Sequence, residues 1–393
     1  MDPLRHVQRV TLSTLIQRPV EVVFIGGLPV AFGMSYKDER FHVIVIGMRC
    51  KENITCPNDQ VMRGARLHPG CIHMEFRTFA VKKFTNMSLI VVGSMAFDQI
   101  ETPFGKSDRI VGGAATYIAW SASQLVQPVN QISVVGGDFP QEELDALAAR
   151  GVNLEGVQVK KDQRSFFWAG RYHMDMNSRD TLETQLNVLA DFEPVVPDSY
   201  QDSEFLMLGN LAPAVQHSVI RQMRRKPKLT VLDTMNFWME SAMPDLERVL
   251  QDVDVLLIND SEARQLSAQY SLVRAAREIM KMGPKYLVIK KGEHGALLFH
   301  EDLVFVAPAL PLEEVFDPTG AGDTFAGGFI GYLARTRDIS FENMKSAVIV
   351  GSAMASFSVE KFGTTRMKEI DKSDVESRIR QFIDLVNFEI QLT

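Results

Sequence analysis

Two aspartates flank a run of small residues late in the chain, in the segment DPTGAGDTFAGGF at 317–329. The run Gly320, Ala321, Gly322 is too poor in side chains to pack, but it can turn several backbone N–H groups toward one point. An apolar, helix-like segment follows, and the unpaired N–H groups at a helix N terminus favour a bound anion. Asp323 stands at the edge of this predicted anion site, where a carboxylate can accept a proton from a hydroxyl group.

Phosphoryl transfer to an alcohol needs these two parts, because donors must neutralise the transferring group and a carboxylate must take the hydroxyl proton. The segment is not a P-loop, since no Gly-Lys-Ser/Thr follows the glycines. No GxGxxG follows the first predicted strand either, which excludes an NAD-dependent oxidoreductase of the usual kind. Asp323 is expected to stay ionised at neutral pH, because the dipole of the following helix favours its charge.

Six short apolar segments alternate with helix-like segments, a pattern typical of βαβ units and of a mainly parallel sheet covered by helices. The predicted strands are 89–93, 131–136, 204–209, 229–234, 254–259 and 286–292. Ligands of such folds bind at the carboxyl ends of the strands, and the segment 317–329 follows the last of them. The interval 164–190 contains two β-type runs without a helix between them, which predicts either a flap over a site or an edge hairpin.

The segment 317–329 resembles the C-terminal signature of the ribokinase/PfkB family of carbohydrate and nucleoside kinases, DTxGAGDxFxGG, with Pro318 at the place of the usual Thr. The resemblance implies an α/β fold, a ribokinase-like three-layer sandwich with a mainly parallel sheet and a small β lid around 164–190. It also implies that Asp323 is the catalytic base and that the N–H groups of Gly320, Ala321 and Gly322 form the anion hole.

Further elements of the family occur in the expected order along residues 87–365. NDSE at 259–262 matches the NxxE element, which helps to hold magnesium, through water, and the phosphates; without the family it is a good helix N-cap. KGEHGA at 291–296 resembles the GxxGA element that borders the nucleotide, and ASFSVEKFG at 355–363 resembles the segment that lines the adenine pocket. The resemblance thus implies nucleotide-binding roles for Asn259, Glu262, Lys291, Gly292, Gly295 and Thr319.

Two elements near residue 100 resemble the family's substrate-binding segments. GSMAFD at 93–98 resembles the element whose aspartate holds substrate hydroxyls, and GGAATYIA at 112–119 resembles GGxxxNxA, with Tyr in place of the usual Asn. This difference leaves the substrate open, but not the reaction. The implied substrate-binding residues are Asp98, Gly112, Gly113, Tyr117 and, in the lid, Arg171. The aromatic lid residues can stack on a base or pack the lid together: Phe166, Phe167, Trp168 and Tyr172.

The main hypothesis is an ATP- and Mg²⁺-dependent kinase that phosphorylates a hydroxymethyl group of a sugar-like substrate. The alternative is a nucleoside kinase such as adenosine kinase. A non-catalytic sugar or nucleotide sensor on the same fold is a third hypothesis, but a sensor has no need for Asp323. The family also implies a monovalent cation, K⁺, with Asp317 as a candidate ligand, and a homodimer formed through the lid.

Composition separates residues 1–86 from residues 87–393. The first part has 12 Lys and Arg against 7 Asp and Glu, and the second has 30 against 42. All three cysteines also lie in the first part. We therefore expect the kinase domain to occupy 87–393, and interpret 1–86 as an ill-packed extension that is absent from the native enzyme if translation starts at Met87. A targeting segment is the competing interpretation, because Arg5, Arg9 and Arg18 stand among few acids.

The overall charge and hydropathy limit the partners of the chain. The formal net charge is −7, whereas proteins that bind nucleic acid or anionic membranes are more often basic. No apolar run approaches the ~20 residues that span a bilayer. Together with the absence of cysteine after residue 86, these features predict a cytoplasmic enzyme that acts on a small molecule, with no nucleic-acid or membrane partner.

Overall fold

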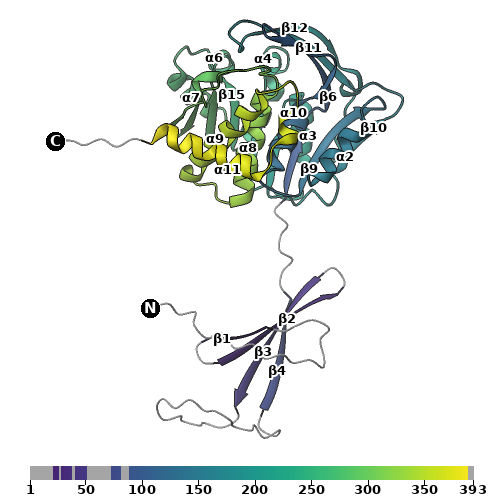
Figure 1. The fold of residues 1–393 in the computed structure, drawn as a ribbon, viewed down its shortest axis with the longest axis vertical. Helices are drawn as coiled ribbons and strands as arrows, with labels where there is room; N and C mark the ends of the chain where they lie inside the picture. Colours follow the sequence, from purple (N-terminus) through teal and green to yellow (C-terminus); the bar gives the residue numbers. More distant parts are fainter. Residues whose placement is uncertain (1–20, 26–27, 38–39, 51–71, 81–87, 388–393) are drawn as a thin grey trace, which may run out of the picture. The chain divides into compact units, whose positions relative to one another are not determined.

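The computed structural model describes residues 21–25, 28–37, 40–50, 72–80 and 88–387 of the chain. The chain divides into two compact units, Met1–Asn86 and Met87–Thr393. Four strands of the first unit are β1 (Glu21–Ile25), β2 (Leu28–Lys37), β3 (Arg40–Cys50) and β4 (Ile72–Ala80). They pair antiparallel in the order β1-β2-β3-β4 (Figure 1). The sequence predicted an ill-packed extension over residues 1–86 and did not predict these strands.

The second unit is built around a nine-stranded sheet. Its strands are β5 (Leu89–Val92), β9 (Val129–Gly136), β10 (Val152–Lys160), β13 (Phe205–Leu208), β14 (Leu229–Asp233), β15 (Val255–Asn259), β16 (Tyr286–Lys290), β17 (Ala296–His300) and β18 (Leu303–Ala307). Their order is β10-β9-β5-β13-β14-β15-β16-β17-β18, parallel as far as β16 and antiparallel for β17 and β18. The six predicted strands are all present.

Helices bury both faces of this sheet. Successive residues of a strand point to opposite faces, and in the central strands the residues on both faces are apolar. In β5, Leu89 and Val91 belong to one core and Ile90 and Val92 to the other, and none of the four has exposed surface. One layer contains α1 (Ala114–Ala122), α2 (Gln141–Ala149), α8 (Ala321–Thr336), α9 (Phe341–Ser358), α10 (Thr365–Glu369) and α11 (Lys372–Val386). The other contains α3 (Pro213–Gln222), α4 (Asn236–Ser241), α5 (Met243–Asp252), α6 (Asp260–Ser267) and α7 (Leu272–Met280). The predicted three-layer α/β sandwich is confirmed.

A second, small mixed sheet forms the lid. Its strands are β6 (Ala96–Thr102), β7 (Gly105–Lys106), β8 (Ile110–Gly112), β11 (Phe166–Tyr172) and β12 (Arg179–Gln185). The order is β12-β11-β6-β7, with β8 also paired to β6 (Figure 1). The predicted lid segment 164–190 supplies only β11 and β12, and the remaining strands come from the chain that follows β5 directly.

The carboxyl ends of the parallel strands meet at one edge of the large sheet, which is where α/β folds bind ligands. Strand β14 ends at Asp233, β15 at Asn259 and β16 at Lys290. Only residues 93–95 separate β5 from β6, so the lid begins at the same edge. Within the described ranges, none of the helices combines the length and the apolar character that a membrane span requires.

Candidate active site

The small-residue loop leads directly into α8, as the sequence predicted. Gly320 is the N-cap residue with a φ of 73°, a left-handed conformation that glycine adopts without steric cost. The N–H of Ala321 donates to Pro318 O at 3.2 Å, which removes one of the three predicted anion-hole donors. For the N–H groups of Gly320 and Gly322, the described part of the chain offers no acceptor. Two of the three predicted donors therefore remain free for an anion.

Tyr117 of α1 packs directly against the anion hole. A Cβ on Gly320 would lie 2.5 Å from three ring atoms of Tyr117, so the loop tolerates only glycine beside this ring. Tyr117 is buried, and its hydroxyl has no hydrogen-bond partner among the described residues. Burial and the charges of Asp317, Asp98 and Asp323 raise the pKa of Tyr117 well above its usual value. The phenol therefore stays protonated and has a hydrogen bond to donate.

Asp98 lies on the lid strand β6 and points at the two glycines that precede α1. A Cβ on Gly112 would lie 1.9 Å from Asp98 Oδ2, and Gly113 has a φ of 92°. Burial, with the charge of Asp317, raises the pKa of Asp98 to about 7. The structure thus brings Asp98, Gly112, Gly113 and Tyr117 together, as the resemblance implied.

Asp323 lies in the first turn of α8, and its Oδ1 atom is buried without a partner in the described part of the chain. Burial and the charge of Asp233 raise its pKa to about 7, although the charges of Lys290 and Arg179 act in the opposite direction. The expectation that the helix dipole keeps Asp323 ionised at neutral pH did not include this burial, which raises the pKa. A carboxylate with a pKa near neutrality is well matched to general-base catalysis.

An ion pair that the sequence did not predict joins the ends of two strands. Lys290 Nζ lies 2.9 Å from Asp233 Oδ1, and both side chains are largely buried. Burial alone would lower the pKa of Lys290, but the charges of Asp233 and Glu262 outweigh it and raise the pKa. The positions of the two residues in the sequence could have indicated this pair, because each residue ends a parallel strand at the edge of the sheet where ligands bind. The family resemblance implied a nucleotide-binding role for the next residue, Lys291, which is half-buried.

Asn259 and Glu262 form a reciprocal capping box at the start of α6. Glu262 N donates to Asn259 Oδ1 and Asn259 N donates to Glu262 Oε2, both at 2.8 Å. Burial raises the pKa of Glu262 to about 7. The cap uses the side-chain oxygen of Asn259, so Glu262 is the residue of this pair with an oxygen left for a magnesium-bound water.

The tip of the lid reaches the segment predicted to border the nucleotide. A Cβ on Gly292 would lie 3.2 Å from Oδ1 of Asn177, which belongs to the loop between β11 and β12. Gly295 has a φ of 80°, and a Cβ there would lie 2.0 Å from Ala307 O. Gly295 is therefore required by the close approach of the Ala307 backbone, whereas Gly292, with a φ of 55°, meets only the side chain of Asn177.

The two faces of β11 have different roles. Tyr172 is buried, and Thr319 Oγ1 donates to its hydroxyl oxygen at 3.2 Å, which joins the lid to the signature loop. Trp168 is paired in register with Asp98 of the parallel strand β6, so the two side chains lie on the same face. Arg171 points the other way and pairs with Glu101 at 2.9 Å. The structure therefore directs Arg171 toward Glu101 and away from Asp98, whereas Tyr172 reaches the signature loop.

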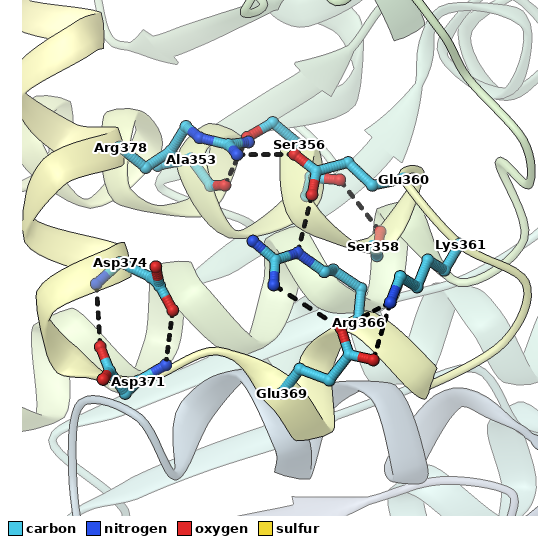
Figure 2. Close-up of polar contacts among 11 residues, drawn as sticks. Ala353, Ser356, Ser358, Glu360, Lys361, Arg366, Glu369, Asp371, Asp374 and Arg378 are labelled. Carbon is cyan, nitrogen blue, oxygen red and sulfur yellow. Dashed lines mark hydrogen bonds and ion pairs between the residues drawn. The ribbon is translucent and has the colours of Figure 1, made fainter.

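The signature loop is anchored from the far side by the segment after α9. Both oxygens of buried Asp317 accept backbone hydrogen bonds, from Thr319 N at 2.8 Å and from Gly363 N at 2.9 Å. Figure 2 shows Glu360 between Arg366 and Arg378, at 2.8 and 2.6 Å. The segment 355–363, predicted to line the adenine pocket, therefore contacts the signature loop and is fixed in place by α10 and α11.

The carboxylates of the site suit a magnesium ion that is bound partly by substrate phosphates, rather than a metal ion that is held by the protein alone. The described residues contain no group of three His, Cys, Asp or Glu placed to hold a metal ion. Mg²⁺ usually keeps several waters and is held by one or two carboxylates together with substrate phosphates. The cluster of Asp233, Glu262 and Asp323 carries more negative charge than Lys290 balances, and Asp323 Oδ1 is unpartnered.

Comparison with known proteins agrees with this geometry. Residues 88–371 match the model of the pfkB family of carbohydrate kinases. A cytidine kinase from Thermococcus kodakarensis is 29% identical over 258 residues, which cover 64% of this chain and 91% of that protein. A nucleoside kinase from Methanothermobacter thermautotrophicus is 27% identical over 306 residues, covering 70% and 90%. A solved E. coli protein assigned as ribokinase II, in complex with ATP and Mg²⁺, has a TM-score of 0.62 at 19% identity, covering 75% of this chain and 99% of that one. The two sequence relatives favour the nucleoside alternative over the sugar hypothesis.

Proposed function

We propose, because this chain belongs to the pfkB family of carbohydrate kinases, that it is an ATP-dependent nucleoside kinase. The chain is a phosphotransferase with an alcohol group of a sugar or nucleoside as acceptor. The choice of a nucleoside rests on Trp168, which is partly exposed on the site-facing side of the lid, beside Asp98. An aromatic ring next to the residue that holds sugar hydroxyls suits a sugar that carries a base. Free ribose has no aromatic base to stack on this ring.

Each part of a nucleoside has a matching group in the site. Asp98 and the unpartnered hydroxyl of Tyr117 bind the ribose hydroxyls, and the Trp168 indole stacks on the base. Asp323 accepts the proton of the hydroxymethyl group as its oxygen attacks the γ-phosphoryl group. The free N–H groups of Gly320 and Gly322 stabilise the charge on that group. Magnesium bound with ATP neutralises phosphate charge, with Glu262 holding it through water.

A panel of acceptors tests the proposal. ADP release by the full chain is measured with ATP and Mg²⁺ on nucleosides, ribose, fructose and inositol. We expect turnover on at least one nucleoside, and a KM for that nucleoside that rises about tenfold or more in Trp168→Ala, because base stacking contributes about 1–3 kcal/mol. Trp168→Phe keeps a ring and should stay within a few-fold of the parent. Arg171→Ala, on the opposite face of the same strand, is the control. Turnover on free sugars alone would support the main sequence hypothesis instead.

We also propose a potassium dependence, an oligomeric state and a location. Both carboxylate oxygens of Asp317 accept hydrogen bonds from backbone N–H groups. A potassium ion beside Asp317 would therefore be liganded largely by carbonyl groups, and we expect it to raise the rate of the enzyme at most moderately. Rates in K⁺ and in tetramethylammonium would test this.

A homodimer through the lid is supported by β12, an edge strand whose seven residues are all exposed, and light scattering would measure it. We also propose a cytoplasmic location, which cell fractionation would test.

A further inference from the structure

Lys290 has a role that neither the family signature nor the sequence pattern assigned. Its side chain is 17% exposed, and its ammonium group lies at the carboxyl end of β16, where Asp233 at the end of β14 holds it at 2.9 Å. An ammonium group has three N–H donors. Within the described residues, Asp233 is the single acceptor recorded for them. Two donors of Lys290 are therefore left over in a site that is largely closed to water.

The position of the ammonium group points to the phosphoryl group. Lys290 Nζ lies 3.0 Å from where a Cβ of Gly322 would be, so it lies directly beside the backbone that supplies a free anion-hole N–H. The next residue, Asp323, has a buried and unpartnered Oδ1. Free donors and an unpartnered carboxylate oxygen thus stand around one place, which is the arrangement that an attacking hydroxyl and a phosphoryl group require.

Charge balance supports the same conclusion. Asp233, Glu262 and Asp323 surround Lys290, and all three raise its pKa against the effect of burial. A phosphate entering this group would be repelled by the three carboxylates without a fixed cation beside it. Lys290 is fully charged at neutral pH and cannot move away, because Asp233 holds it and the strand end fixes its backbone.

We propose that Lys290 is a catalytic residue that donates to the oxygens of the transferring phosphoryl group. This inference rests on the proposed function. As the substrate oxygen forms its bond to the γ-phosphorus, the bond from that phosphorus to the oxygen of the β-phosphate breaks and ADP leaves. The hydroxyl proton goes to Asp323. Lys290 stays protonated throughout and stabilises charge, so the step balances without any proton passing through it.

Affinity for ATP relative to ADP separates this role from a structural one. The full chain is titrated by calorimetry with Mg²⁺ and either the β,γ-imido analogue of ATP or ADP. A lysine that touches the γ-phosphoryl group affects only the first ligand. We expect Lys290→Met to weaken the analogue about tenfold or more while the affinity for ADP changes little, since a hydrogen bond to a charged group is lost. Turnover should fall about 10²–10³-fold.

Three further variants act as controls. Lys281→Met removes a lysine at the end of α7 whose side chain is 69% exposed and should leave both affinities and turnover within about twofold, as for a surface change. Lys290→Arg keeps a cation and should recover part of the preference for the ATP analogue. If Lys290→Met fails to fold because Asp233 is left unpaired, the double variant Asp233→Asn with Lys290→Met removes both buried charges and is measured instead.

Each outcome decides for or against the proposal. Equal weakening of the two nucleotides, or no change in either, means that Lys290 only balances the charge of Asp233, and the proposal is overturned. An effect of Lys281→Met as large as that of Lys290→Met also overturns it. The binding measurement needs no acceptor substrate, so it reports on Lys290 even if the parent enzyme proves to act on a sugar and the nucleoside proposal fails.

Discussion

Asp98, Asp317 and Asp323 lie in one buried group around the Tyr117 ring, and their charges affect one another. This concentration of carboxylates has a consequence for the acceptor. A substrate with a phosphate near Asp98 would be repelled, whereas neutral hydroxyls can donate to the carboxylates. The unpartnered phenol of Tyr117 adds a donor in the same place. The residues therefore suit an uncharged, hydroxyl-rich acceptor such as a nucleoside or a free sugar.

The raised pKa of Asp98 predicts how stability depends on pH. Its pKa is about 7 in the folded protein against an ordinary 3.8, so the folded state holds the proton more tightly than the unfolded state. The contribution of Asp98 to the free energy of unfolding is thus present below about pH 4 and is lost as the pH rises through about 7. We expect Asp98→Asn, measured by urea unfolding without ligands, to lose less stability than the parent between about pH 5 and about pH 8.

A surface aspartate provides the control for this experiment. The side chain of Asp198 is 91% exposed, so Asp198→Asn should keep the pH dependence of the parent. Identical slopes for the parent and Asp98→Asn would mean that burial does not shift this carboxyl.

One predicted substrate-binding residue of the lid, Arg171, points away from the buried carboxylates, and the reason is the period of a β-strand. Arg171 pairs with Glu101 on one face of β11, whereas Tyr172, which the sequence named only among the aromatic lid residues, contacts Thr319 on the other face. Successive side chains of a strand point to opposite faces, so an error of one residue selects the wrong face. Asp323 and Gly320 were singled out by residue type and spacing, whereas Asp98 was named only through the family resemblance.

At the scale of elements, helix α6 begins at the N-cap residue Asn259, which also lies next to the proposed phosphate site. Asn259→Ala removes the acceptor of the Glu262 N–H, so the free energy of unfolding should fall by about 0.5–2 kcal/mol. Asn259→Asp keeps the cap and should retain this stability. Chemical unfolding of the two variants beside the parent measures the difference. A loss of turnover in Asn259→Ala without any loss of stability would instead give Asn259 a direct role at the phosphates.

The elements that the sequence revealed are those buried on both faces. All six predicted strands belong to the parallel part of the large sheet, where apolar runs are continuous. Strands β17 and β18 were missed because they form an antiparallel hairpin at the edge, and four of the five residues of β18 are exposed or half-exposed. The lid was only half predicted, since β6 continues from β5 almost without a break in the apolar pattern.

At the scale of the whole molecule, the two compact units predict independent folding of the second. Both apolar cores of the second unit are made of residues from Leu89 onward. We therefore expect a chain that begins at Met87 to fold and to keep full activity. Its melting temperature and its ATP turnover are compared with those of the full chain. A clear loss in either quantity would make residues 1–86 part of the enzyme.

The central claim is that Asp323, at the start of α8, accepts the hydroxyl proton during phosphoryl transfer. The most direct test is the turnover of Asp323→Asn on the best acceptor of the panel, with the affinity for the ATP analogue measured beside it. The variant keeps the size of the side chain but cannot accept the proton, and the N–H groups of Gly320 and Gly322 remain to bind phosphate. We expect turnover to fall at least about a hundredfold with nucleotide affinity little changed. Turnover within a few-fold of the parent would contradict the account and place the base elsewhere.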